Sequence, residues 1–149
     1  MNNALWERFF DVTLWFSAAG HFATLIASFQ VPYRLEWKRE LAQLMPFNRK
    51  LMWVQSGFTV LSIFAFGVLT LVLHGEMLRG DRAALALVFY IAVFWTTRIL
   101  VDAFYYSHED WPPGKQFVIG HVLLTCLFVA QAASYWGLFV WHVLLRGNG

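Results

Sequence analysis

Long runs without charged side chains limit what this chain can fold into more than any other feature of its sequence. Residues 51–73 and 116–145 contain no Asp, Glu, Lys or Arg, residues 12–29 contain none either, and residues 83–106 contain only two. A helix needs about 20 mainly apolar residues to cross the hydrocarbon layer of a membrane. The sequence therefore predicts four membrane-spanning helices, at about residues 10–30, 50–74, 83–106 and 116–143.

The composition of the chain agrees with this assignment and excludes several functions. Hydrophobic residues make up 59% of the sequence and charged residues 13%, whereas charged residues are about a quarter of a typical soluble domain. We expect an all-α fold, an integral membrane four-helix antiparallel bundle, in which residues 1–149 form one domain with short connections. A single cysteine, Cys126, excludes a thiol relay, and the lack of a basic block excludes nucleic acid as a partner.

The connection after the first predicted span has the pattern of an amphipathic helix. Pro32 should end the preceding helix near residue 30, because proline disfavours a helical conformation in the residue before it. Trp37, Leu41 and Leu44 then recur on one helical face, with basic residues between them. This segment is predicted to be a short helix in the membrane interface, and a solvated loop helix is the alternative.

The distribution of basic residues predicts the orientation of the protein in the membrane. Residues 31–50 and 107–115 lie on one side and hold six Lys and Arg residues, against four on the other side. Cytoplasmic connections carry an excess of Lys and Arg. We therefore expect residues 31–50 and 107–115 to lie in the cytoplasm, at a bacterial inner membrane or another cell membrane.

Each predicted span carries polar residues at helical spacing in the same half of the bilayer. Residues that recur every three or four positions share one face of a helix. Such a face belongs in the interior of a membrane protein, because lipid leaves its polar groups without partners. We therefore expect one polar chamber that all four helices share and that opens toward residues 107–115. The four stripes are Ser17, His21, Thr24 and Ser28; Gln55, Thr59 and Ser62; Arg98, Asp102, Tyr105 and Glu109; and His121 and Thr125.

Arg98 and Asp102 lie inside the third predicted span, where charge is costly. An ionised side chain at the centre of a membrane helix costs about 2.5–3.5 kcal/mol on insertion scales. Because the two residues are four positions apart, they can offset each other as an ion pair, so a purely structural role is one interpretation. Arg98 can also extend its long side chain toward the headgroups.

The other interpretation is a small-molecule site in the predicted chamber. Arg98 would bind a carboxylate, phosphate or quinone oxygen, and His21 or His121 would carry a proton. Asp102 would orient one of the histidines, and these four residues are the catalytic candidates if the protein is an enzyme. The predicted ligand-binding residues are His21, Gln55, Arg98, Asp102, Tyr105 and His121. The predicted aromatic wall consists of Trp53, Phe94, Trp95, Tyr105 and Tyr106.

A haem or metal site is a further alternative. A glycine directly precedes both His21 and His121, and it would let a flat macrocycle lie close to each helix between two imidazole ligands. A non-haem ion would instead use imidazole and carboxylate ligands. Its candidate ligands are His21, Asp102, His108 and His121.

The sequence contains no motif that identifies a reaction, such as a nucleophile elbow, a phosphate-binding loop or a zinc-protease signature. We therefore expect an accessory or binding protein for a quinone- or lipid-like molecule of the bilayer. The alternative is an enzyme for redox or acid–base chemistry in the membrane. Runs of small residues at 18–20 and 130–134 would allow contact with a second copy or with another membrane protein.

Overall fold

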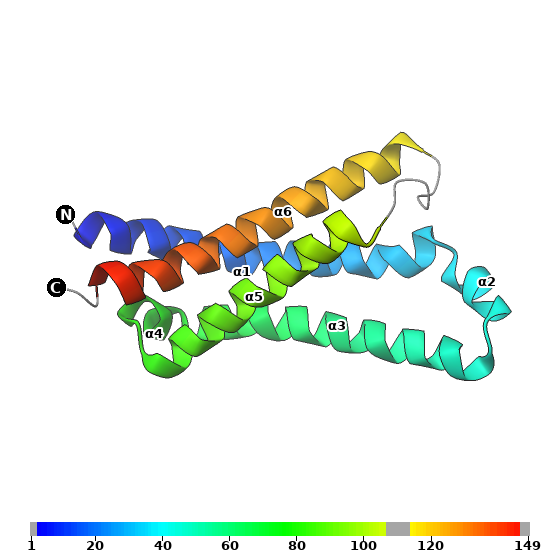
Figure 1. Ribbon diagram of the computed structural model, residues 1–149, viewed down its shortest axis with the longest axis horizontal. Helices are drawn as coiled ribbons and strands as arrows, with labels where there is room; N and C mark the ends of the chain where they lie inside the picture. Colours follow the sequence, from blue (N-terminus) through cyan, green and yellow to red (C-terminus); the bar gives the residue numbers. More distant parts are fainter. Residues whose placement is uncertain (1–2, 107–113, 147–149) are drawn as a thin grey trace.

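The computed structural model describes residues 3–106 and 114–146, which form helices and contain no strand (Figure 1). The long helices are α1 (Asn3–Arg34), α3 (Pro46–Val72), α5 (Arg82–Phe104) and α6 (Lys115–Val140). Together they provide four segments that are long and apolar enough to cross a membrane, which confirms the prediction of four such helices. The short elements are α2 (Trp37–Glu40), the 3-10 helix η1 (Leu41–Gln43), α4 (His74–Arg79) and the π-helix η3 (Trp141–Arg146).

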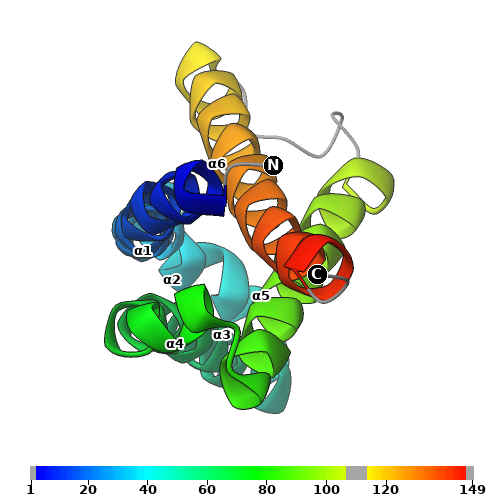
Figure 2. The same ribbon diagram turned by 90° about the vertical axis from the view of Figure 1, so that its left-hand side faces the viewer.

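The long helices lie roughly along the long axis of the molecule (Figure 1). The start of α1, α4 and η3 lie at one end, which we call the α4 end, and α2 lies at the opposite end, the α2 end. α6 packs against α5 and α1, and α3 packs against α1. Seen from the α4 end, α6 lies between α1 and α5 (Figure 2).

The largest buried side chains lie where the long helices meet. They include Leu14 of α1, Ile91 and Trp95 of α5, and Tyr135 and Leu138 of α6. The outer faces of the same helices carry large exposed apolar side chains, among them Phe16, Phe58, Leu61 and Leu100. Such a surface suits contact with lipid chains, which are as apolar as leucine.

Helix α1 is longer than predicted and contains a proline. It continues through Pro32 to Arg34, so the expectation that it ends near residue 30 is wrong. Pro32 lies in the last turn, where its missing N–H removes one hydrogen bond, and the amide of Leu35 still donates to the Val31 carbonyl at 2.9 Å. Membrane helices tolerate proline where neighbouring groups satisfy the freed backbone.

The amphipathic segment forms less helix than predicted. α2 contains four residues, and η1 continues it for three more. Glu36, which precedes α2, has the left-handed backbone conformation (φ 47°), and this turn separates α2 from α1. Trp37 packs edge-on against Trp53 of α3, with ring centroids 5.4 Å apart. This aromatic contact ties α2 to the start of α3.

Candidate functional site

The two histidines of the predicted site lie in two separate polar clusters instead of one. The first, which we call the central cluster, consists of His21 of α1, Thr70 of α3 and Tyr135 of α6, all fully buried. The Tyr135 hydroxyl oxygen lies 3.0 Å from His21 Nε2 and 2.6 Å from Thr70 Oγ1. One phenolic oxygen therefore links three long helices.

The hydrogen bonds of the central cluster indicate where its protons lie. Thr70 Oγ1 is also 2.7 Å from the carbonyl of Phe66, one turn earlier in α3, and a carbonyl can only accept. We therefore assign the Thr70 hydroxyl as donor to Phe66 and the Tyr135 hydroxyl as donor to Thr70. His21 Nε2–H then donates to Tyr135. The other ring nitrogen, His21 Nδ1, is buried without a hydrogen-bond partner among the described residues.

A glutamine beside the central cluster explains the glycine that precedes His21. Gln131 Nε2 donates to the Ser17 carbonyl at 2.8 Å. A β-carbon at Gly20 would collide with this same nitrogen. Gly20 therefore makes room for the Gln131 amide where α6 crosses α1, a packing role that differs from the predicted approach of a macrocycle.

The second cluster gathers around a carboxylate of α5, and we call Arg98, Asp102, His121 and Thr125 the Asp102 cluster. His121 Nε2 lies 3.1 Å from Asp102 Oδ2, and Thr125 Oγ1 donates to the same oxygen at 3.1 Å. Arg98 Nη1 lies 3.7 Å from Asp102 Oδ1. The Asp102 side chain is 8% exposed, whereas those of Arg98 and His121 are 38% and 31% exposed. A nearly buried carboxylate thus faces an arginine and a histidine whose side chains are about a third exposed, although Arg98 Nη1 is itself buried without a hydrogen-bond partner among the described residues.

A cavity of about 1050 Å³ lies beside this cluster, between α1, α5 and α6 toward the α2 end, and we call it the α1–α5–α6 cavity. Arg98, Asp102 and His121 line it, together with two basic residues that the sequence analysis assigned to no site, Arg34 and Lys115. Most of the remaining wall is apolar and includes Val31, Phe117, Ile119, Leu123 and Leu127. A cavity of this size, with a few polar groups in an apolar wall, has the character of a ligand site.

Aromatic rings separate the two clusters. Trp95 stacks on His21 with ring centroids 5.6 Å apart and on Phe128 with centroids 4.9 Å apart. The guanidinium carbon of Arg98 in turn lies 5.3 Å from the centre of the Phe128 ring. His21 is fully buried and does not line the α1–α5–α6 cavity. The expectation of one chamber that holds both histidines and Arg98 is therefore wrong.

Gln55 and Tyr105, also in the predicted ligand-binding set, are exposed side chains. The predicted stripe on α3 does not turn inward at Gln55, and the hydroxyl groups of Thr59 and Ser62 need no partner from another helix. Thr59 Oγ1 donates to the Gln55 carbonyl at 3.0 Å, and Ser62 Oγ donates to the Phe58 carbonyl at 2.9 Å. Serine and threonine in a membrane helix can satisfy their hydroxyls on their own backbone in this way.

The two histidines are not arranged as a pair of haem ligands. His21 Nε2 is bonded to Tyr135 and His121 Nε2 faces Asp102, so neither ring presents this nitrogen to a shared space. Within residues 3–106 and 114–146, no group of three or more His, Cys, Asp or Glu side chains could hold a metal ion. The candidate ligand His108 lies outside the described residues.

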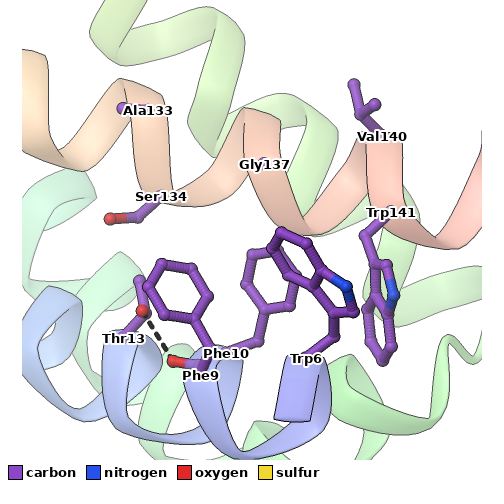
Figure 3. Close-up of a pocket in the computed structure, with 9 residues that line it drawn as sticks. All are labelled: Trp6, Phe9, Phe10, Thr13, Ala133, Ser134, Gly137, Val140 and Trp141. Carbon is purple, nitrogen blue, oxygen red and sulfur yellow. Dashed lines mark hydrogen bonds between the residues drawn. The ribbon is translucent and has the colours of Figure 1, made fainter. Parts of the chain in front are cut away.

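A smaller cavity of about 380 Å³ lies toward the α4 end, between α1 and the end of α6 (Figure 3). Trp6, Phe9 and Phe10 approach it from α1, and Gly137 lies opposite them on α6. The hydrogen bond at its edge, from Thr13 Oγ1 to the Phe9 carbonyl at 2.7 Å, stays within α1. Among the described residues its wall contains no charged or titratable side chain, so this part of the wall offers no proton carrier for acid–base chemistry.

The sequence analysis missed three residues that the structure buries between helices, Thr70, Gln131 and Tyr135. Each is a polar residue within a long apolar run, and none belongs to the stripes that were recognised. Gln131 and Tyr135 are one helical turn apart, and this spacing was a signal for a second polar stripe on α6.

Comparisons of the chain with models of protein families, with curated proteins and with solved structures find no match. The function is therefore inferred from the two polar clusters and the α1–α5–α6 cavity. Of these, the cavity combines accessible polar groups with space for a ligand, and an accessible guanidinium can bind an anionic or carbonyl oxygen.

Proposed function

We propose that this protein is a multi-pass membrane protein that binds a quinone- or lipid-like amphiphile in the α1–α5–α6 cavity, in an accessory or binding role. In this proposal α1, α3, α5 and α6 cross the bilayer as an antiparallel four-helix bundle, and α2 lies in the membrane interface. The α2 end, with the basic residues of segment 31–50, faces the cytoplasm.

The observation that carries the proposal is the position of the Asp102 cluster in the wall of a mainly apolar cavity. Arg98 Nη1, which faces the carboxylate at 3.7 Å, is buried and has no hydrogen-bond partner among the described residues, so the ion pair leaves a donor unsatisfied. Here the carboxylate is nearly buried, while Arg98 and His121 keep about a third of their side-chain surface exposed. Both also line the cavity. This arrangement supports a role in binding as well as in stability.

The two parts of the cavity match the two parts of an amphiphile. Arg98 can donate to two oxygens of a carboxylate or phosphate, or to a carbonyl oxygen, while Asp102 holds it in place. Leu123 and Leu127 contribute to an apolar wall for the tail. A molecule that enters from the bilayer gains no hydrophobic free energy, because hydrocarbon surrounds it on both sides. The polar head must therefore decide which molecule binds.

The proposal is tested by mass spectrometry of the molecules that copurify with the protein. Gly120→Phe places an aromatic ring in the cavity, because Gly120 lines it and a β-carbon there meets nothing within 4 Å. Gly57→Phe places the same ring on α3 away from the cavity, in equally open space. Wild type and Gly57→Phe should carry the same amphiphile, and Gly120→Phe about tenfold less, which corresponds to about 1.4 kcal/mol. Equal amounts in three folded proteins contradict the proposal.

An acid–base enzyme is a second candidate, favoured by the 3.1 Å distance between His121 Nε2 and Asp102 Oδ2 at the cavity wall. His121 would exchange a proton with the bound molecule, and Asp102 would orient the imidazole ring. The extracted molecule distinguishes the two candidates when wild type is compared with His121→Gln. An enzyme accumulates unreacted substrate in the variant, whereas a binding protein carries the same molecule in both.

A further inference from the structure

We infer that the head of the bound amphiphile is an anion, a phosphate or carboxylate group of a membrane lipid, which Arg34 and Lys115 recognise together with Arg98. This inference rests on the proposed function and deepens it, because it names negative charge as the property that the site selects. Arg34 is the last residue of α1 and Lys115 is the first residue of α6. Both line the α1–α5–α6 cavity.

Among the described residues that line the cavity, positive charges outnumber negative ones. The lysine, arginine and carboxylate side chains in this part of the wall are Arg34, Arg98, Lys115 and Asp102, three positive charges and one negative. Asp102 faces Arg98 at 3.7 Å and offsets one positive charge, which leaves two. These charges border an apolar wall, where they are screened less than in open water.

Two arginines outside the cavity wall, Arg39 and Arg79, are paired with carboxylates, whereas Arg8, Arg49 and Arg82 have no carboxylate partner among the described residues. Arg39 forms an ion pair with Glu36 at 2.6 Å, and Arg79 pairs with a glutamate at 3.1 Å. Arg34 instead donates from Nε to the amide oxygen of Gln30 at 3.3 Å, and no carboxylate among the described residues pairs with it. Arg34 differs from the other unpaired arginines because it lines the cavity, where an anion from outside the chain would be its partner.

The depths of the basic residues fit a lipid better than a soluble ion. Arg34 and Lys115 lie at helix ends, where basic side chains meet lipid headgroups. Arg98 lies six residues before the end of α5 at Phe104, about 9 Å deeper at 1.5 Å per residue. The Arg98 side chain reaches from there toward Asp102, one turn nearer the end of α5. The cavity wall on α6 extends from Lys115 to Leu127, about 18 Å by the same rise. A lipid with its anionic head between Arg98 and the helix ends and a chain along α6 occupies both parts.

Neutral and zwitterionic heads fit this wall less well. A quinone carbonyl can accept a hydrogen bond from Arg98, but it leaves the charges of Arg34 and Lys115 without compensation. A zwitterionic head brings its own cation, which the same two residues repel. An anionic lipid is therefore the occupant that the charges of the wall favour.

The inference is tested by native mass spectrometry of the purified full-length protein with phosphatidylglycerol and phosphatidylcholine that have identical acyl chains. Wild type should bind the anionic lipid at least about tenfold more tightly. Arg34→Gln/Lys115→Gln should lose most of this preference and still bind phosphatidylcholine. Lys38→Gln/Lys50→Gln removes the same charge from exposed positions at the same end, outside the cavity wall, and should keep the preference.

Further measurements distinguish a lipid headgroup from a free anion. They also show whether a negative result contradicts charge selection alone or the proposed function as well. Displacement of phosphatidylglycerol by oleate supports the inference, whereas binding of inorganic phosphate in place of any lipid overturns it. Equal affinity for both phospholipids, or equal loss in both double variants, also overturns it. If Gly120→Phe still lowers lipid binding in that case, the proposed function stands without charge selection. If Gly120→Phe has no effect, the proposed function fails as well.

Discussion

The phenolic oxygen of Tyr135 joins α1, α3 and α6 through its contacts with His21 and Thr70. Tyr135→Phe removes this oxygen and leaves the buried His21 Nε2–H without an acceptor. Such a loss costs about 1–3 kcal/mol, so the free energy of unfolding in detergent should fall by that amount. SDS titration followed by circular dichroism measures it. Tyr90→Phe is the control, since Tyr90 is 58% exposed, and equal stability of the two variants would show that the central cluster contributes nothing.

Substitution of two glycines by alanine should change the stability of the protein in opposite directions. Gly20→Ala places a β-carbon against Gln131 Nε2, which must leave the Ser17 carbonyl, so the variant should lose about 1–3 kcal/mol of stability. Gly57→Ala meets no atom within 4 Å and should gain about 0.5–1 kcal/mol, because alanine loses less backbone entropy than glycine in a helix. The free energies of unfolding of the two variants are measured in the same detergent. A Gly20→Ala variant as stable as Gly57→Ala would contradict the packing of Gln131.

At the scale of residues, the sequence predicted part of the candidate site. Arg98 and Asp102 share a helical face, and the depth of His121 on the next helix placed it near them, as the structure shows. His21 has a similar depth, but two rings, Trp95 and Phe128, lie between it and Arg98. Depth and helical phase restrict where a side chain lies on its own helix. They do not specify which side chains of other helices intervene.

At the scale of elements, an aromatic pair joins α2 to α3, and α2 also contacts α1. Trp37 and Trp53 lie 5.4 Å apart in an edge-on arrangement, which contributes about 0.5–1.5 kcal/mol beyond the area it buries. Trp37→Ala should therefore increase trypsin cleavage after Lys38 and Arg39 by about two- to tenfold, because α2 detaches more often. Tyr33→Ala serves as the control, since Tyr33 is 88% exposed. Unchanged cleavage in Trp37→Ala would show that other contacts hold α2.

A comparison of α1 and α3 shows that a polar stripe on a helix does not always predict which side chains are buried. The polar stripe of α1 is buried at Ser17, His21 and Thr24, as a polar face inside a membrane protein should be. The corresponding stripe of α3 is exposed at Gln55 and Thr59, and the Thr59 hydroxyl can face lipid at little cost because it is bonded to its own helix. A stripe of serine and threonine therefore predicts burial less well than one that contains a histidine or a charge.

At the scale of the whole molecule, the number of long helices could be predicted because the thickness of a bilayer sets the length of each apolar run. Their ends differ from the prediction by a few residues, most clearly at α1, which continues past Pro32. Which helices pack together could not be predicted. That choice depends on contacts such as the rings of Trp95 and Phe128 between α5 and α6, which the periodicity of single helices does not encode.

The proposed antiparallel topology predicts that Arg8 and Arg79 lie on one side of the membrane and Lys38 on the other. Single cysteines at these positions, in a Cys126→Ser background, can be labelled in sealed vesicles with a reagent that does not cross the bilayer. Arg8→Cys and Arg79→Cys should react together, and Lys38→Cys only after the vesicles are opened or inverted. Labelling of all three from one side would exclude four crossings of the membrane.

The central claim is that the α1–α5–α6 cavity holds an amphiphile at the Asp102 cluster, and photo-crosslinking tests it most directly. A lipid with a diazirine on its acyl chain is activated in vesicles that contain the protein, and the modified residues are identified by peptide mass spectrometry. The account predicts adducts concentrated on the cavity wall, at Val31 of α1 and at Leu123 and Leu127 of α6. Adducts spread evenly over outward positions such as Phe58 and Leu61 of α3, with none enriched in the cavity, would contradict it.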